Sequence, residues 1–351
     1  MLNRYIARLY VRYILLILGA LVAFFVGMDM VSENERLPDS ANLTLLYVLF
    51  QALYSLELIL PLSLVFGAIA AKIHLTRMNE LVASYALGAS RLRVLFPFVA
   101  VALLFSMAYV AMTTTPLAYA GDRARAIKQD RFFVSSTHQL FFKFDSSFVY
   151  IDELLPLQNE ARGVEILEVS GGDLVRHIRA ERAFFRQNAW QLESVEQINK
   201  PPVSGLQEAG IDRLWYPHYE ALRGFRPEIM DNVYEGRSAF SLIDAARAWQ
   251  LFSNQQISTD RIRGVFYSGL LFPLFAPIFV VIMFFFVPIS PRFFNVAIFS
   301  SMAVLVTLGG WGSLYALSQL ARTGTLSPEL ALLLPFALSF LVAGYLVKKE
   351  R

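Results

Sequence analysis

Six long apolar stretches constrain this chain more than any other feature, because about 20 mostly apolar residues in a helix cross the hydrocarbon layer of a membrane. They are about Tyr13 to Val31, Leu45 to Ala71, Val94 to Thr114, Val265 to Val287, Phe293 to Leu317 and Leu330 to Val347. Only 17% of the 351 residues are charged and 56% are apolar, whereas about a quarter of a typical soluble domain is charged. We therefore expect an α-helical membrane protein with six transmembrane helices.

Lysine and arginine side chains cluster beside alternate ends of these stretches, and such clusters mark the cytoplasmic side of a membrane. The members of these clusters are Arg4, Arg8, Arg12, Lys72, Arg77, Arg91, Arg93, Arg292, Lys348, Lys349 and Arg351. The loops on the other side hold only Arg36 and Arg322. We expect both termini in the cytoplasm and the long polar segment outside it.

The polar segment between the third and fourth stretches, about Ala120 to Arg263, is predicted to form a β domain. Its β-branched and aromatic runs are Phe132 to His138, Gln139 to Phe144, Ser147 to Asp152, Gly163 to Val169, Leu174 to Ala180, Ala189 to Val195 and Ile211 to Tyr216. Short strands separated by turn residues predict a β-sandwich, a jelly-roll or an open barrel. A helix over Ser241 to Phe252, with Ser241 as its N-cap, is expected to lead back to the membrane.

The sequence lacks the patterns of common catalytic and nucleotide-binding sites. It contains no cysteine, which excludes thiolate metal sites and cysteine nucleophiles. No Walker-type, H-E-x-x-H or G-x-S-x-G motif occurs, and the four histidines lack metal-ligand spacing. Glu57 is the one mid-span ionisable candidate. We expect no catalytic residue, no metal site and no cofactor bound by this chain.

The loop after the second stretch carries the most informative motif. It runs from Asn79 through Glu80-Leu81-Val82-Ala83-Ser84-Tyr85-Ala86-Leu87-Gly88-Ala89-Ser90, and Ile59-Leu60-Pro61-Leu62-Ser63-Leu64 precedes it. We expect a short helix, with Glu80 near its N-terminus where a negative charge is favourable and Gly88 providing a sharp exit. Two interpretations stay open: a solvated loop between spans, or a coupling helix that docks in a cleft of a cytoplasmic ATPase.

These motifs, with Phe148 to Glu153 and Leu326 to Pro335, resemble the LptF/LptG (YjgP/YjgQ) family of lipopolysaccharide-export permease subunits over essentially the whole chain. The resemblance implies helices 1–3 over residues 1–119 with a coupling helix at about 76–93, a periplasmic β-jellyroll over 120–262, and helices 4–6 over 263–351. Asn79 and the Ser84 to Leu87 centre of the loop depart from the family pattern. The features match both subunit types of the family.

The resemblance also implies a function and a set of partners. The chain would be a permease subunit of an ABC transporter that extracts lipopolysaccharide from the inner membrane of a Gram-negative bacterium and passes it to a periplasmic bridge for delivery to the outer membrane. The implied partners are a cytoplasmic ATPase dimer that uses ATP-Mg, a paralogous permease subunit, and, through the β-jellyroll, a single-span membrane subunit and the bridge protein. The chain itself would be no enzyme and would bind no nucleic acid.

The implied ATPase contacts lie in the loop motif, at Glu80, Leu81, Ser84, Tyr85, Gly88 and Ser90. A basic cluster beyond the third stretch, Arg123, Arg125 and Lys128, has two interpretations. The side chains either reach the headgroup layer as ordinary interfacial residues, or they bind lipid phosphates, for which arginine is well suited. The resemblance implies the second role for Arg123 and, by weaker correspondence, for Arg125 and Lys128.

Spans one and five enclose the lipid cavity in the family, so the resemblance implies cavity or gate positions at Phe24, Phe25, Phe299, Val304 and Leu308. The same side chains suit ordinary lipid contact and helix packing. Three other functions make different demands on a sequence of this kind. A membrane-anchored β-domain scaffold or sensor needs no docking helix, a lipoprotein-release permease carries its outer domain after span one, and an intramembrane enzyme needs paired catalytic residues.

Overall fold

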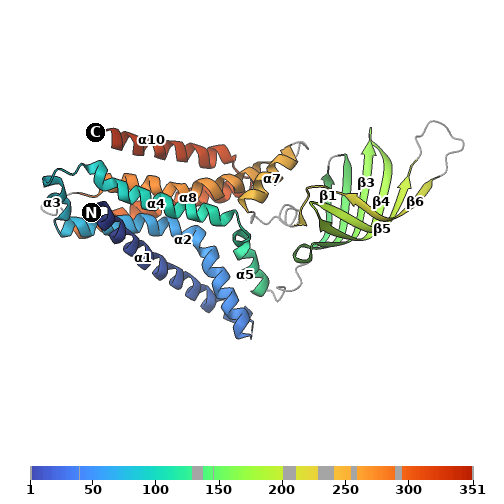
Figure 1. Ribbon diagram of the computed structural model, residues 1–351, viewed down its shortest axis with the longest axis horizontal. Coiled ribbons are helices and arrows are strands. Elements are labelled where there is room, and N and C mark those ends of the chain that lie inside the picture. The colour runs from blue at the N-terminus through green and yellow to red at the C-terminus, as the bar shows by residue number, and fades with distance from the viewer. Residues whose placement is uncertain are drawn as a thin grey trace. The chain divides into compact units, whose positions relative to one another are not determined.

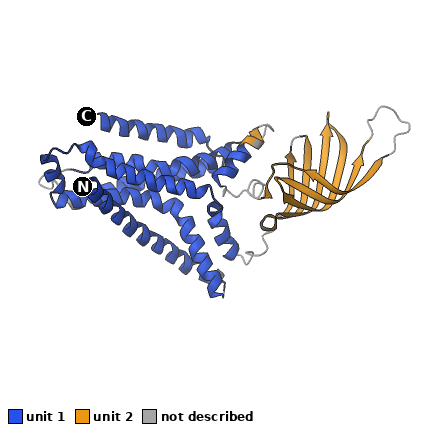
Figure 2. Ribbon diagram, viewed as in Figure 1, with its two compact units in different colours: residues 1–128, 240–249, 258–351 blue, residues 129–239, 250–257 orange. Residues whose placement is uncertain are grey.

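The computed structural model describes residues 2–38, 40–128, 137–144, 146–200, 211–227, 241–253, 259–288 and 295–349. The chain divides into two compact units (Figure 2). The first, residues 1–128, 240–249 and 258–351, is helical, and the second, residues 129–239 and 250–257, contains a β-sheet. We call them the helical unit and the β unit.

Six helices of the helical unit are long and apolar enough to cross a membrane, which confirms the six predicted spans. They are α1 (Leu2–Ser32), α2 (Ala41–Arg77), α4 (Arg91–Thr113), α8 (Asp260–Phe286), α9 (Val296–Arg322), and a last helix made of η5 (Glu329–Leu333) and α10 (Leu334–Lys349). The shorter elements are η1 (Asn34–Arg36), α3 (Glu80–Ala86), η2 (Pro116–Tyr119), α5 (Ala120–Lys128) and α7 (Leu242–Ser253). Figure 1 shows the long helices as one bundle.

The bundle packs around α2, which contacts α1, α5, α8 and α9. An apolar core joins α1, α2, α4 and α8. In it the Tyr10 and Phe98 ring centroids lie 5.1 Å apart, and those of Phe98 and Phe284 lie 5.7 Å apart. The Tyr10 hydroxyl donates a hydrogen bond to the carbonyl oxygen of Leu64 at 2.8 Å. The central position of α2 means that most of its side chains face protein rather than lipid.

A proline in α8 leaves one backbone carbonyl group without its helical hydrogen bond, and a side chain of a neighbouring helix donates to that carbonyl group instead. Pro277 has no N–H, so the carbonyl of Pro273, four residues earlier, has no helical donor. The Ser106 hydroxyl of α4 donates to that carbonyl oxygen at 2.9 Å. Such a bond matters in an apolar layer, where water does not reach an unpaired carbonyl group.

The β unit contains one antiparallel sheet whose strands follow one another in chain order. They are β1 (Thr137–Phe144), β2 (Ser147–Leu155), β3 (Glu160–Ser170), β4 (Asp173–Arg186), β5 (Ala189–Asn199) and β6 (Asp212–Ala221). This order is a meander, so the described strands do not confirm the expected jelly-roll, which needs crossing connections. The predicted strand over Phe132 to His138 lies mostly outside the described residues.

The two faces of the sheet differ in polarity, as the alternation of residues along each strand requires. One face buries the cross-strand row Phe142, Val149, Ile166 and Ile178. The other face carries charged pairs, including Arg162 with Glu153 at 3.1 Å and Arg179 with Glu165 at 2.6 Å. Partial burial opposes ionisation of Glu165, but hydrogen bonds and charge from Arg179 and His177 lower its pKa.

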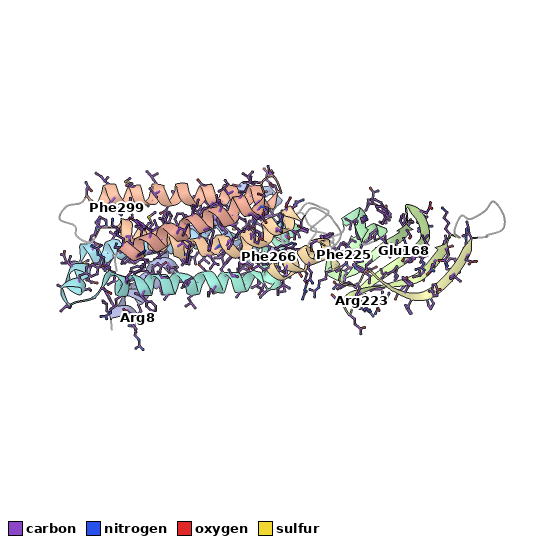
Figure 3. The ribbon with its side chains drawn as sticks, turned by 90° about the horizontal axis from the view of Figure 1, so that it is seen from above. Arg8, Glu168, Arg223, Phe225, Phe266 and Phe299 are labelled. Carbon is purple, nitrogen blue, oxygen red and sulfur yellow. The ribbon has the colours of Figure 1, made fainter. Side chains whose placement is uncertain are left out.

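Phe225 closes the apolar face of the β unit. Its ring centroid lies 5.0 Å from that of Phe142 and 5.8 Å from that of Phe252, a residue in the last turn of α7 that belongs to the β unit. Trp190 Nε1 donates to the Phe225 carbonyl oxygen at 2.7 Å. Figure 3 labels Phe225 beside Glu168 and Arg223 of the same unit.

The division between the units falls after residue 128, whereas the sequence placed it after 119. The reason is α5, a short amphipathic helix that packs on α2 and buries Ala120, Ala124 and Ile127. Gly121 makes this packing close, since a Cβ there would lie 2.6 Å from Cδ2 of Tyr54. The predicted helix over Ser241 to Phe252 corresponds to α7, and Ser241 caps it by accepting a bond from the Asp244 N–H at 3.1 Å.

Candidate functional site

The helical unit has two ends, which we name after the short helices that they carry. At the α3 end, α1 and α4 begin and α2 ends. At the α5 end, α2 begins and α1 and α4 end. Figure 1 shows that both chain termini lie toward the α3 end. Within the same unit, Figure 3 places Arg8 and Phe299 toward the α3 end and Phe266 toward the other.

At the α3 end, residues 79–90 form a helix and turn between α2 and α4. Asn79 precedes α3 in the left-handed conformation, with φ of 56°, which asparagine adopts more readily than most residues. Gly88 follows α3 with φ of 86°, where a side chain would be strained. The Ser90 hydroxyl then accepts a bond from the Arg93 N–H at 3.2 Å and caps α4. The predicted short helix is therefore present, with Glu80 in its first turn.

One side of α3 is fixed to the bundle and the other is open. Leu81 is buried, and the Tyr5 hydroxyl of α1 donates to Glu80 Oε1 at 3.0 Å. The Ser84 hydroxyl donates to the Glu80 carbonyl oxygen at 2.7 Å. Val82 is 41% exposed and Leu87 is 89% exposed. These two apolar side chains, which the sequence did not single out, make the open side of α3 suited to a protein contact.

The remaining predicted ATPase contacts lie in the same segment. Tyr85 is half-buried and packs against the core of the bundle. Ser90 is exposed, as is Gly88. The structure thus brings all six predicted residues into one short segment at the α3 end, although Leu81 and Tyr85 serve packing there.

Lys72 ties α2 to α8 just before α3. The sequence placed this lysine in the loop, but it lies inside α2 and is 3% exposed. Its Nζ donates to the carbonyl oxygens of Phe284 and Val287, the latter at 2.5 Å, and lies 4.2 Å from the centroid of the Phe284 ring. A lysine at a helix C-terminus satisfies carbonyl groups that lack helical donors and complements the helix dipole.

At the α5 end, the three predicted basic residues lie on α5 and have different surroundings. Arg125 forms an ion pair with Asp122 of its own helix. Lys128 Nζ lies 3.5 Å from a Glu33 carboxylate oxygen and 3.9 Å from one of Asp29. The Arg123 guanidinium lies 5.6 Å from the centroid of the Phe50 ring.

Arg123 is therefore the basic residue of α5 with no ion pair to a carboxylate among the described residues. The cluster as a whole is a mixed-charge surface and not a uniformly positive one.

The five predicted cavity residues divide into three groups. Phe24 is 68% exposed on α1, and Val304 and Leu308 are exposed on α9. Phe25 is half-buried. Phe299 is buried, with its ring 5.2 Å from that of Phe286, so its side chain serves packing in this structure. Both α1 and α9 contact α2.

Two charged residues that the sequence treated separately meet at the α5 end. Arg322 was expected in a loop, but it ends α9 and forms an ion pair with Glu57 of α2. The sequence did contain a signal for this ion pair. Glu57 lies within one apolar stretch and Arg322 lies beside another, and an unpaired charge is unfavourable in a membrane.

The fold and these two ends define a multi-pass membrane protein with a folded β unit between its third and fourth spanning helices in chain order. The chain belongs to the LptF/LptG family. The family model for the lipopolysaccharide export system permease LptF/LptG matches residues 4–349, which confirms the resemblance over essentially the whole chain. No match was found among curated proteins.

The first prediction concerns Lys72. Lys72→Met removes the donor to the Phe284 and Val287 carbonyl groups while keeping an apolar chain of similar length. A hydrogen bond to a charged group contributes about 1.5–3 kcal/mol, so we expect a loss of stability of about that size in thermal unfolding of the purified protein. The control is Lys143→Met on the exposed surface of β1, and equal stability of the two variants would contradict the assignment.

Proposed function

We propose that this chain is a permease subunit of an ABC transporter that extracts lipopolysaccharide from the inner membrane and passes it to a periplasmic bridge for delivery to the outer membrane. Membership of the LptF/LptG family over residues 4–349 carries the proposal. The two ends of the helical unit support it, because one carries a helix suited to docking and the other a surface suited to lipid phosphate.

The proposed orientation places the α3 end in the cytoplasm and the α5 end and the β unit in the periplasm of a Gram-negative bacterium. Basic side chains gather at the α3 end, where Arg4, Arg8, Arg12, Arg77, Arg91, Arg93, Lys348 and Lys349 lie near helix ends. The α5 end carries charges of both signs: Asp29, Glu33 and Glu35 near η1, and the basic residues of α5 together with Arg322. This asymmetry agrees with the positive-inside rule, with both termini cytoplasmic.

At the cytoplasmic face, α3 would dock in a cleft of a separate ATPase subunit. Val82 and Leu87 offer apolar contact, and Glu80 offers a carboxylate whose position Tyr5 fixes. Hydrolysis of ATP-Mg would belong to that subunit, so this chain would catalyse no reaction and bind no cofactor. Movement of α3 would reach the bundle through the end of α2, where Lys72 and Thr76 contact the carbonyl groups at the end of α8.

At the periplasmic face, Arg123 would bind a phosphate of the lipid. Its guanidinium group lies against Phe50 and has the planar fork that suits phosphate. Lys128 and Arg125 would join it by exchanging their carboxylate partners for the phosphate. The acyl chains would lie along the exposed apolar surfaces of α1 and α9, which include Phe24 and Leu308, and a paralogous subunit would complete the cavity.

The β unit would pass the lipid on by extending its sheet into a partner. Strand β6 is an edge of the described sheet, and an edge strand pairs readily with a strand of another chain. It exposes Leu214, Trp215 and Tyr216, with Trp215 70% exposed. The proposed partners are the single-span membrane subunit and the bridge protein.

The proposed topology is tested by labelling single cysteines, since the chain has none of its own. Ser146 lies in the exposed turn between β1 and β2, so Ser146→Cys should react with an impermeant maleimide added from the periplasmic side. Leu87→Cys, in the exposed turn after α3, is the matched position and should react only after the inner membrane is opened. The reverse pattern would contradict the orientation.

The coupling role is tested by Glu80→Arg. We expect loss of ATPase co-purification and of export with normal expression, because an arginine reverses the charge that α3 presents. Tyr5→Phe is the matched control, since it removes the hydrogen bond to Glu80 and leaves the carboxylate in place. Retention of the ATPase and of export by Glu80→Arg would refute the coupling role, and equal losses in both variants would assign Glu80 to packing alone.

The phosphate role is tested at Arg123. If Arg123 only reaches the headgroup layer, Arg123→Lys should be silent, because lysine reaches it too. If it binds phosphate with both N–H groups, a charge-assisted hydrogen bond of about 1.5–3 kcal/mol is lost, and lipid binding should weaken roughly ten- to a hundredfold. Binding is measured as the lipopolysaccharide retained by the purified Arg123→Lys protein and by the parent chain, and contact is tested separately by photocrosslinking to lipopolysaccharide from position 123.

Redundancy within the basic cluster is addressed by the triple variant Arg123→Ala/Arg125→Ala/Lys128→Ala. The matched control is Arg162→Ala, which removes an exposed arginine of the β unit. Absence of a crosslink from position 123, together with normal export by the triple variant, would leave only the interfacial role for these residues.

A further inference from the structure

The ion pair between Arg322 and Glu57 joins three helices at one point. Arg322 ends α9, and its NH2 group donates to Glu57 Oε1 of α2. Its Nε donates to the Ser268 hydroxyl of α8 at 2.6 Å. The Arg322 side chain is 14% exposed and that of Glu57 is 27% exposed. One guanidinium group therefore holds α9 to α2 and α8.

The depth of the pair follows from helix length. Twenty residues separate Glu57 from Arg77 at the end of α2, and at 1.5 Å a residue they span about 30 Å. That is about the thickness of the hydrocarbon layer. In the proposed orientation, with Arg77 at the cytoplasmic boundary, this length would place Glu57 near the opposite boundary of the layer.

Backbone contact between α8 and α9 fixes the same point independently. A Cβ on Gly264 would lie 2.1 Å from the Ala321 carbonyl oxygen, so only glycine lets the two backbones approach this closely. Arg263, the residue of α8 before Gly264, donates to Glu329 Oε1 at 2.6 Å. The last turn of α9 and the start of the next helix are thus both attached to the first turns of α8.

Farther along α9, toward its α3 end, Phe299 and Ala303 pack in the apolar core, and Ile298, Met302 and Leu305 are exposed. Apolar contacts are non-directional, so neighbouring side chains are exchanged at small cost when a helix tilts. The ion pair between Arg322 and Glu57 cannot exchange partners in this way. If the two side chains separate, each charge is left poorly hydrated and without a partner.

We propose that Glu57, Arg322 and Gly264 form a fixed anchor about which α9 pivots during transport, with the movement at the α3 end of α9. Glu57 and Arg322 are then positioning residues that keep the α5 end of α9 against α2 and α8 throughout the cycle. This inference rests on the proposed function, in which α9 borders the lipid path. The alternative is a latch, in which the ion pair between Glu57 and Arg322 breaks and re-forms in every transport cycle.

The attachment itself is tested by the reactivity of a cysteine at Leu320, an exposed position in the last turn of α9. Glu57→Gln and Arg322→Gln should each speed maleimide labelling of Leu320→Cys in membranes. The double variant should be no faster than either single variant, and the exchanged pair Glu57→Arg/Arg322→Glu should slow it again. Coupled neighbours show non-additivity of about two- to a hundredfold.

The labelling control is Glu153→Gln, which breaks an exposed ion pair in the β unit and should leave the rate unchanged. Unchanged rates in both single variants, or additive effects in the double variant, would overturn the anchor. This assay needs no transport, so it decides the attachment even if the proposed function fails.

The fixed pivot is tested by a covalent bridge in the full transporter complex. Glu57→Cys/Arg322→Cys is joined by a short bifunctional methanethiosulfonate that replaces the lost side-chain atoms. An anchor predicts that the bridged protein exports lipopolysaccharide at the rate of the parent chain. Export that stops on bridging and returns on reduction would overturn the anchor in favour of a latch. Absence of export by the parent chain would instead count against the proposed function.

Discussion

Polar groups within an apolar layer have to be paired inside the protein, and the arrangement of this helical unit depends on how α2 meets that requirement. Lys72, near one end of α2, donates to the last carbonyl groups of α8, and Glu57, nearer the other end, pairs with Arg322 of α9. A similar bond, from Ser106 to the carbonyl of Pro273, joins α4 to α8. These bonds fix the positions of the helices, and the apolar core fills the space between them.

The same arrangement relates the two ends of the unit. At the α3 end, the turn that carries Glu80 follows directly on the part of α2 attached to α8. At the α5 end, α2 supports the helix that carries Arg123 and holds the last turn of α9. In the proposed function, one helix thus connects the ATPase contact with the lipid surface. In the β unit, charged and apolar side chains alternate along the strands. One face of the sheet is therefore apolar and forms a core, and the other face is polar.

Much of the fold could be predicted because its signals are local. The six apolar stretches, the strands of the sheet, α7 and the short helix after Asn79 follow from periodicity, turn residues and capping. What the sequence could not supply depends on pairing between distant segments. The single charges Glu57 and Arg322 were a signal for a pair but did not identify the partner, and nothing in the sequence indicated that Lys72 and Phe299 are buried or that α5 packs on α2. The strand order also depends on which edges meet, and the described strands form a meander that leaves the expected jelly-roll unconfirmed.

The central claim is that this chain works with an ATPase to move lipopolysaccharide. Its most direct test is purification from native inner membrane under mild detergent, followed by mass spectrometry of the intact complex. We expect an ABC ATPase dimer, a second LptF/LptG-family chain and bound lipopolysaccharide in one assembly. A chain that purifies without an ATPase and carries only phospholipid would contradict it.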